Sequence, residues 1–228
     1  MKKKKNEYNA YWRNWFRASD IPERFWDKKL KRDILNLKFA DQNIEFDDIY
    51  SVILNAWKNN KNYGLFFIGN KGNGKTLTAV TIMKKLLFEL EKEDRQKIGF
   101  IDLSNMLFEY KQSWNGSFEQ KAEIAAKLQK VKKVPVLVID EFFRHYADWQ
   151  HETIDLLLKY RDSQSFITII TSNNSMSDIV QKINSDEDEI ISILGSYDSV
   201  EFLGKDRRIH SNSPLKSKIE GKDVSGKN

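Results

Sequence analysis

The chain has 228 residues, no cysteine and a formal net charge of +5. Without cysteine, neither disulfide bonds nor thiolate metal sites are available. No stretch approaches the roughly 20 apolar residues of a membrane-spanning helix, and the start of the chain does not resemble a secretory leader. We therefore expect one α/β domain with a substantial core, working in the cytoplasm without a membrane partner.

The charge is concentrated at the two ends of the chain. Residues 1–38 carry a net +7 and residues 205–228 a net +4, so the segment between them carries −6. Basic ends on an acidic body favour contact with a polyanion such as nucleic acid. The alternative is that the basic ends only keep the protein soluble.

The first 17 residues are basic and rich in aromatic side chains. If the segment is helical, one face carries Tyr8, Tyr11, Trp12, Trp15 and Phe16. This face could dock in the groove of a protein partner or stack on nucleic-acid bases. It could also pack against the protein's own domain.

A phosphate-binding loop is the most specific motif in the chain. An apolar run at 65–68 predicts a buried strand, and apolar residues at three- and four-residue spacing from Leu77 predict a helix. Between them, two glycines frame four residues and precede Lys75 and Thr76. Glycine lets backbone N–H groups curl around phosphates, Lys75 reaches the β- and γ-phosphates, and the Thr76 hydroxyl ligates Mg²⁺. The residues expected to contact the nucleotide are Gly69, Asn70, Lys71, Gly72, Asn73, Gly74, Lys75, Thr76 and Leu77.

Strands and helices alternate along the rest of the chain. The predicted strands are 65–68, 97–103, 134–139, 166–171 and 200–203. A continuous apolar run such as 134–139 is typical of a strand covered on both faces of a parallel sheet. The predicted helices are 47–59, one capped by Ser104, one capped by Ser117 and running to about 130, 149–162 and 177–183.

Polar residues follow two of these strands and complete the predicted site. Strand 134–139 ends in Asp140 and Glu141. In phosphate-loop ATPases an aspartate at this position holds Mg²⁺, and the following glutamate polarises the attacking water. Strand 166–171 is followed by Ser172 and Asn173, and we expect Asn173 to sense the γ-phosphate. The alternatives are an ordinary acidic loop and an ordinary turn.

These motifs, in this order, resemble the AAA+ ATPases of the DnaC/DnaI helicase-loader and IstB type. The resemblance covers residues 18–210, between the N-terminal segment 1–17 and a tail, 211–228, that we expect to be disordered. The matching features are Ile21-Pro22-Glu23-Arg24-Phe25, the loop 69–76, Val138-Ile139-Asp140-Glu141, Arg161, Thr171-Ser172-Asn173 and the closing segment from Phe202 to Arg208.

The resemblance implies a P-loop fold with a five-stranded parallel sheet flanked by helices, and no C-terminal helical lid. Strand 166–171 would lie between 65–68 and 134–139. ATP and Mg²⁺ are the implied cofactors, with Thr76 and Asp140 as metal ligands and Glu141, Asn173 and Arg208 as catalytic residues. It also implies side-by-side assembly of ATP-bound subunits and binding to single-stranded DNA and a replicative helicase.

We therefore expect a replication protein that loads or recruits a replicative helicase. A phage or mobile-element origin is expected in part because lysine (29) far exceeds arginine (9). The alternatives are an IstB-like ATPase that assists a transposase and an ATP-binding assembly module with little turnover. Residues 183–204 contain no Lys or Arg, although the family carries an arginine for a neighbour's ATP near Ser192-Ile193. We expect slow turnover by the protein alone.

Single-stranded DNA is expected to contact the region 104–118. Stacking faces are offered by Phe108, Tyr110, Trp114 and Phe118, and Lys111 offers a positive charge. The alternative is that most of these aromatic side chains belong to the core.

Overall fold

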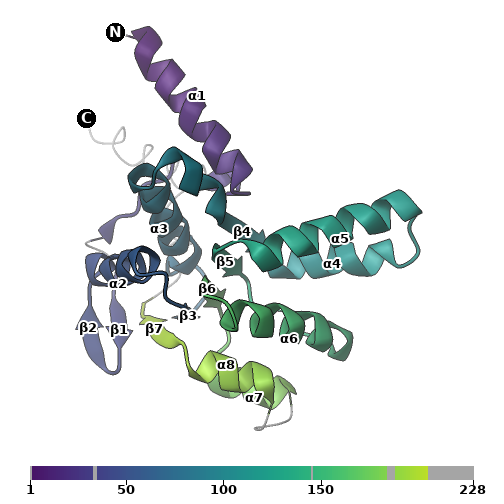
Figure 1. The fold of residues 1–228 in the computed structure, drawn as a ribbon. Coiled ribbons are helices and arrows are strands. Elements are labelled where there is room, and N and C mark those ends of the chain that lie inside the picture. The colour runs from purple at the N-terminus through teal and green to yellow at the C-terminus, as the bar shows by residue number, and fades with distance from the viewer. Residues whose placement is uncertain (1, 33–34, 145, 184–187, 205–228) are drawn as a thin grey trace, which may run out of the picture.

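The chain folds around one seven-stranded sheet with the strand order β2-β1-β7-β3-β6-β5-β4. The computed structural model describes residues 2–32, 35–144, 146–183 and 188–204. Helices surround the sheet in Figure 1. The strands are β1 (Leu37–Phe39), β2 (Gln42–Ile44), β3 (Tyr63–Gly69), β4 (Ile98–Asp102), β5 (Val136–Asp140), β6 (Ile167–Ser172) and β7 (Asp198–Phe202).

The five predicted strands are all present and run parallel, from β7 through β3, β6 and β5 to β4. β6 lies between β3 and β5, as the resemblance implied, because Leu65 and Val138 both pair with Ile169. These inner strands are buried on both faces, which is why each one is a continuous apolar run.

The predicted number of strands, five, is wrong, because a hairpin adds two antiparallel strands at one edge of the sheet. Leu37 of β1 lies opposite Ile44 of β2 and opposite Phe202 of β7. Each hairpin strand has only three residues. The turn residues Ala40 and Asp41 have φ of 46° and 63°, so the turn lacks the glycine that usually marks a hairpin in a sequence.

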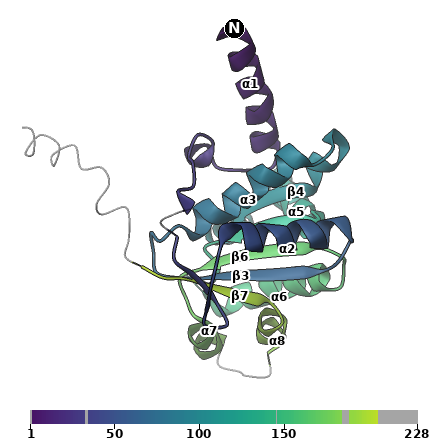
Figure 2. The same cartoon turned by 90° about the vertical axis from the view of Figure 1, so that its left-hand side faces the viewer.

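Helices cover both faces of the sheet in two layers (Figures 1 and 2). Strand side chains alternate between the faces, so Phe67 lies in one core cluster and Phe66 in the other. The first cluster contains residues of α1 (Lys2–Ala18), α2 (Phe46–Lys58) and α3 (Lys75–Glu89). The second contains residues of α4 (Leu103–Ser113), α5 (Phe118–Lys133), α6 (Asp148–Asp162), α7 (Met176–Ile183) and α8 (Glu189–Gly195).

No helix in the described part of the chain is long and apolar enough to cross a membrane. The longest of these helices, α1, is basic and carries aromatic residues instead. Trp12 and Phe16 are buried, and the Trp12 ring packs edge-on against Phe88 at 4.2 Å between centroids. Of the three interpretations of the N-terminal segment, packing on its own domain therefore holds for these two rings. Tyr11 remains 40% exposed.

α4 and α5 form a helical hairpin that projects from the β4 edge of the molecule (Figure 1). The cap of α4 is Asp102 rather than the predicted Ser104, since an Asp102 carboxylate oxygen accepts from the Asn105 backbone N–H at 3.0 Å. Ser117 caps α5, as predicted. Among the residues of α5, all of which are described, only Val131 is buried. Most of the hairpin surface is therefore open to a ligand.

Arg161 is the bulkiest fully buried side chain among the described residues. Its guanidinium donates to the carbonyl oxygens of Val134 (2.6 Å) and Ile167 (2.8 Å) and to the Thr168 hydroxyl (2.9 Å). Burial lowers the pKa of Arg161 to about 9, so the side chain stays charged at neutral pH. Arg161 thus joins α6 to β6 and to the chain entering β5, and it cannot reach a nucleotide on a neighbouring subunit.

We expect Arg161→Met to lower the free energy of unfolding by about 3 kcal/mol, because buried carbonyl oxygens lose their donor. The midpoint of thermal unfolding should fall by roughly 6–12 °C. A matched control is Arg32→Met, which removes an exposed ion pair with Asp47 (2.7 Å) and should change stability by less than about 1 kcal/mol. Equal stability of the two variants in urea unfolding would contradict the assigned role.

Candidate active site

The phosphate-binding loop joins the end of β3 to the start of α3. Gly69, Gly72 and Gly74 have φ of 144°, 81° and 107°, which residues with a Cβ rarely adopt. A Cβ on Gly69 would also lie 2.4 Å from the Phe202 carbonyl oxygen. α3 begins at Lys75, so its first N–H groups and the positive end of its dipole face the loop.

The Lys75 ammonium lies at the centre of the loop. It donates to the backbone oxygens of Gly69 (2.6 Å) and Asn70 (2.8 Å) and to Oδ1 of Asn173 (2.9 Å). The side chain is buried, with 6% of its surface exposed. The contact with Asn173 brings the expected γ-phosphate sensor, just after β6, next to the expected phosphate ligand.

Asn73 holds the loop in shape. Its side chain is buried, its amide group donates to the Phe202 carbonyl at the end of β7, and its Oδ1 accepts from Lys75 at 3.3 Å. The Asn73 side chain therefore faces the protein interior. Asn73 thus ties the loop to the end of β7, and Lys75 ties it to Asn173, which follows β6; β7 and β6 are the two strands that flank β3.

The loop forms one wall of a cleft of about 510 Å³. Asp140, Glu141 and Asn173 line the same cleft. Gly69, Asn70 and Asn73 are not among its lining residues. The other six residues expected to contact the nucleotide line it: Lys71, Gly72, Gly74, Lys75, Thr76 and Leu77. The structure thus gathers residues from three strand ends, far apart in the sequence, around one cavity.

Asp140 and Thr76 are in direct contact at the carboxyl end of β5. The Thr76 hydroxyl donates to Asp140 Oδ1 at 2.7 Å, and the Thr171 hydroxyl donates to the same oxygen. Burial raises the pKa of Asp140, although hydrogen bonds from Thr171 and Thr76 oppose the shift. The buried carboxylate is therefore an unfavourable charge that a cation would offset. A carboxylate and a hydroxyl are hard oxygen donors, and they fit a Mg²⁺ ion completed by phosphate and water oxygens.

Glu141 follows Asp140 in a conformation that is unusual for its residue type. Glu141 and Phe143 both have φ of 57°, the left-handed region that residues with a Cβ rarely enter. The end of β6 and the chain after it hold this turn: Phe142 N–H donates to the Thr171 carbonyl (2.9 Å), and the Asn174 side-chain amide donates to the Phe143 carbonyl (2.7 Å). Such strain persists where the surroundings enforce it, often at functional sites.

An ion pair occupies the Glu141 carboxylate. The Arg144 guanidinium, three residues further along, contacts Glu141 Oε2, and the two side chains are 41% and 28% exposed. Arg144 also lines the nucleotide cleft. Arg144 lies three residues after Glu141, and outside a helix this spacing does not predict that two side chains meet. The sequence therefore did not indicate this pair.

The structure adds a basic segment to the cleft. Arg24, Phe25 and Lys28, in and after the 3₁₀-helix η1 (Glu23–Phe25), line the cleft. Lys84 of α3 holds this segment by donating to the carbonyl oxygens of Phe25 (3.2 Å) and Lys28 (3.0 Å). Desolvation lowers the pKa of Lys84. Ile21 to Phe25 belonged to the resemblance, but contacts between residues 56 and 59 positions apart could not be read from the sequence.

Arg208, the remaining catalytic residue that the resemblance implied, lies outside the described residues. The same holds for Arg207 and for the expected disordered tail, 211–228.

Solved structures with this fold include proteins of DNA replication. DnaI is 21% identical with a TM-score of 0.54, and the alignment covers 76% of this chain and 95% of DnaI. The DnaC helicase loader is 22% identical with a TM-score of 0.55, covering 80% and 100%. AMPPCP-bound DnaA from Aquifex aeolicus is 16% identical with a TM-score of 0.52, covering 80% and 53%. At these identities the likeness shows a shared fold.

The sequence itself matches one family. A comparison with curated proteins finds no match. The family described as "ATPase family associated with various cellular activities (AAA)" matches residues 65–193. This range is more than half of the chain, and it contains the phosphate-binding loop, Asp140, Glu141 and Asn173. The chain therefore belongs to the AAA family of ATPases.

Proposed function

We propose that this protein is a cytoplasmic ATPase that loads or recruits a replicative helicase onto single-stranded DNA. Membership of the AAA family implies nucleotide binding. The observation that carries the helicase proposal is the extent of the fold likeness, which covers 95% of DnaI and 100% of the DnaC helicase loader. A nucleotide site on such a fold supports a loader that uses ATP.

ATP would bind with its phosphates in the loop, where Lys75 and the backbone N–H groups meet them. Thr76 and Asp140 would hold Mg²⁺, which when bound offsets the negative charge of the β- and γ-phosphates. Glu141 would accept the proton of the attacking water. Asn173 already lies 2.9 Å from the Lys75 ammonium, so it would lie beside the γ-phosphate.

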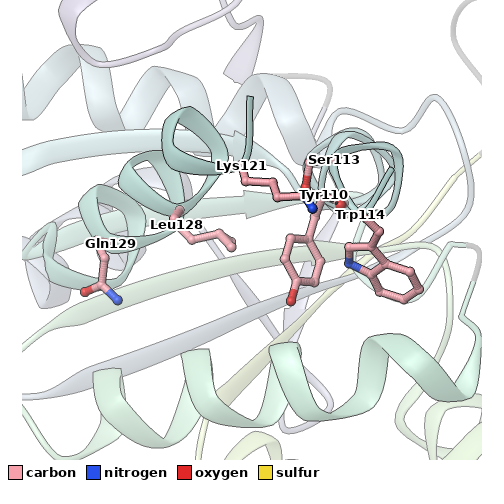
Figure 3. Close-up of a pocket in the computed structure, with 7 residues that line it drawn as sticks. Tyr110, Ser113, Trp114, Lys121, Leu128 and Gln129 are labelled. Carbon is pink, nitrogen blue, oxygen red and sulfur yellow. Dashed lines mark hydrogen bonds between the residues drawn. The ribbon is translucent and has the colours of Figure 1, made fainter. Parts of the chain in front are cut away.

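Single-stranded DNA would bind along the α4–α5 hairpin. Phe108, Trp114 and Phe118 are 58%, 47% and 82% exposed, so they lie outside the core. A cleft of about 520 Å³ is lined by Tyr110 and Trp114, and Lys121 extends toward them from α5 (Figure 3). Exposed rings stack on bases, and ammonium groups neutralise phosphates.

We expect Phe118→Ala to weaken the binding of oligothymidylate by roughly 5- to 150-fold, because stacking contributes about 1–3 kcal/mol per base. Anisotropy of a labelled oligonucleotide with ATP present measures this, and affinity should fall as salt rises. Phe39→Ala is the matched control, since Phe39 is 38% exposed on the hairpin at the opposite edge of the sheet. Native protein that binds no DNA even at low salt would contradict the DNA proposal.

Helicase loading is tested with the purified replicative helicase of the source organism and circular single-stranded DNA. We expect the helicase to be transferred to the circle only when this protein and ATP are both present. Capture of a transposase, with no binding to the helicase, would instead support the IstB-like alternative.

ATP turnover by the protein alone should be slow. An arginine at the γ-phosphate contributes about 10³–10⁵ in rate, yet residues 183–204 contain no Lys or Arg and Arg161 is buried. Steady-state hydrolysis over a concentration series measures this. Fast turnover that rises steeply with concentration would mean that one subunit supplies the arginine to the next. Slow turnover even with DNA and helicase would support the remaining alternative, an ATP-binding assembly module with little turnover. The ion pair between Glu141 and Arg144 also favours this alternative.

A further inference from the structure

Exposed basic side chains lie along the chain from α1 to the mouth of the nucleotide cleft. Between residues 13 and 32, seven Lys or Arg side chains are exposed, against three Asp or Glu side chains. One of the seven, Arg32, is paired with Asp47. The other six form what we call the basic stripe: Arg13, Arg17, Arg24, Lys28, Lys29 and Lys31.

Ring contacts hold the stripe on the surface between α1 and the cleft. The Arg17 guanidinium of α1 lies 5.5 Å from the centroid of the Trp26 ring, just after η1. Arg24 and Lys28 lie over the ring of Phe25, at 4.9 Å and 5.5 Å from its centroid. Both of these cations line the nucleotide cleft. The stripe therefore ends at the rim of the nucleotide site.

The acidic side chains among these residues do not cancel the charge of the stripe. Asp27 pairs with Arg13 at 3.2 Å, and Asp20 pairs with Lys130 of α5 at 2.7 Å. All four side chains are about half exposed or more, and such pairs contribute only about 0.2–1 kcal/mol. A polyanion can therefore replace the Asp27 carboxylate at Arg13, and the stripe keeps an excess of cations.

The stripe offers charge without stacking faces. Residues 13–32 are all described, and none of their aromatic rings is exposed: Phe16 and Phe25 are buried, and Trp15 and Trp26 are half-buried. Unpaired bases need exposed rings on which to stack. A duplex hides its bases and presents one phosphate charge per about 1.7 Å of its axis. A cationic surface without rings therefore fits a duplex better than a single strand.

The stripe meets the α4–α5 hairpin at the β4 edge of the sheet. The Ser19 carbonyl, just after α1, accepts from the Phe100 N–H of β4 at 3.0 Å, and β4 is the last strand in the order. The Asp20–Lys130 pair then joins the same turn to α5. A surface with exposed rings and a surface with cations alone thus lie next to each other.

We propose that the basic stripe binds the phosphate backbone of duplex DNA, so that the protein holds a junction between single-stranded and double-stranded DNA. Unpaired bases lie on the rings of the hairpin, and the cations of the stripe neutralise the phosphates of the adjoining duplex. On a junction the second contact forms at a high effective concentration. The junction rests on the proposed single-strand site, whereas duplex binding by the stripe goes beyond it and stands without it.

The test compares three labelled ligands: a blunt duplex, the same duplex with an oligothymidylate tail, and the tail alone. The variant combines Arg17→Ala with Lys29→Ala, two exposed residues that do not line the nucleotide cleft. We expect it to bind the blunt duplex roughly 5- to 60-fold more weakly at about 0.1 M salt, because each lost phosphate contact lowers the salt slope of log affinity by about 0.9. The slope should therefore fall by about two. Anisotropy over a salt series measures both quantities.

The matched control combines Lys58→Ala with Lys61→Ala. These two exposed lysines lie where the chain enters β3, at the opposite end of that strand from the phosphate-binding loop, so the control should bind all three ligands as the native protein does. Phe118→Ala should weaken binding of the tail and leave binding of the blunt duplex unchanged. The native protein should bind the tailed duplex more tightly than either part.

Several outcomes would overturn the inference. Native protein that binds no blunt duplex at low salt has no duplex site, whether or not the tail binds. If the Arg17 and Lys29 variant binds the blunt duplex as tightly as the Lys58 and Lys61 control does, the duplex lies elsewhere. If that variant instead loses capture of the replicative helicase, the stripe binds an acidic protein surface. Equal losses for tail and duplex would make the stripe part of the single-strand path.

The three ligands also separate this inference from the proposed function. If the blunt duplex binds through the stripe but the tail alone does not bind, the single-strand part of the proposed function fails and the duplex site stands. If the tail binds and the blunt duplex does not, the proposed function stands and the duplex site fails.

Discussion

Glu141→Gln should bind ATP as tightly as the native protein and hydrolyse it about 10²–10⁴ times more slowly, the usual contribution of a general base. Glutamine keeps the size and hydrogen-bonding reach of glutamate but cannot take a proton from water. The turn that holds Glu141 at φ 57° is fixed by backbone bonds of its neighbours, so the variant should fold normally. A fluorescent ATP analogue measures binding, and single-turnover hydrolysis measures the chemical step.

A matched control separates the base from a general loss of charge. Glu189 is an exposed glutamate on α8, paired with Lys159 at 2.5 Å. The same exchange there, Glu189→Gln, should leave ATP binding and hydrolysis as in the native protein. Unchanged turnover in Glu141→Gln would mean that Glu141 is not the general base, and that another group in the cleft has this role.

The central part of the fold could be predicted because its signals are local. The loop 69–76 carries its own glycines, and β3, β5 and β6 are apolar runs that end where the polar residues begin. Parallel strands end at the same edge of a sheet, so residues following different strands meet there. That rule explains why Lys75, Asp140 and Asn173 could be placed in one site from the sequence.

The remaining features of the fold and of the site depend on contacts between distant residues, which leave no local pattern in the sequence. The β1–β2 hairpin was missed because its strands are short and its turn residues, Ala40 and Asp41, are not glycine. Arg24 and Lys28 reach the cleft only through the packing of η1 against α3, where Lys84 holds the backbone.

The aromatic residues of 104–118 are a second case that the sequence alone could not decide. Their spacing allowed both a core and a DNA surface, because a hydrophobic ring gives the same signal in either case. The outcome depends on how α5 lies on α4, and Phe108, Trp114 and Phe118 are in fact exposed. Exposed large rings in a cluster are typical of binding surfaces, which is why the DNA proposal rests on the structure more than on the sequence.

Lys75→Ala should lose ATP affinity by about 10²–10⁴-fold. In the protein as it stands the ammonium is held by backbone oxygens and Asn173. A triphosphate would replace these neutral oxygens with anionic ones. Each charge-assisted hydrogen bond contributes about 1.5–3 kcal/mol, and two of them account for this range. Isothermal titration with a non-hydrolysable ATP analogue and Mg²⁺ measures the loss.

The control for this variant lies on the same helix. Lys85 of α3 pairs with Asp47 at 3.3 Å, away from the cleft, so Lys85→Ala should keep the native affinity. Lys75 is buried, and its removal could also loosen the loop, so unfolding of both variants should be compared without nucleotide. If Lys75→Ala is as stable as Lys85→Ala, a loss of affinity reports the phosphate contact itself. If it binds ATP as tightly as Lys85→Ala does, the loop does not hold the phosphates through this lysine.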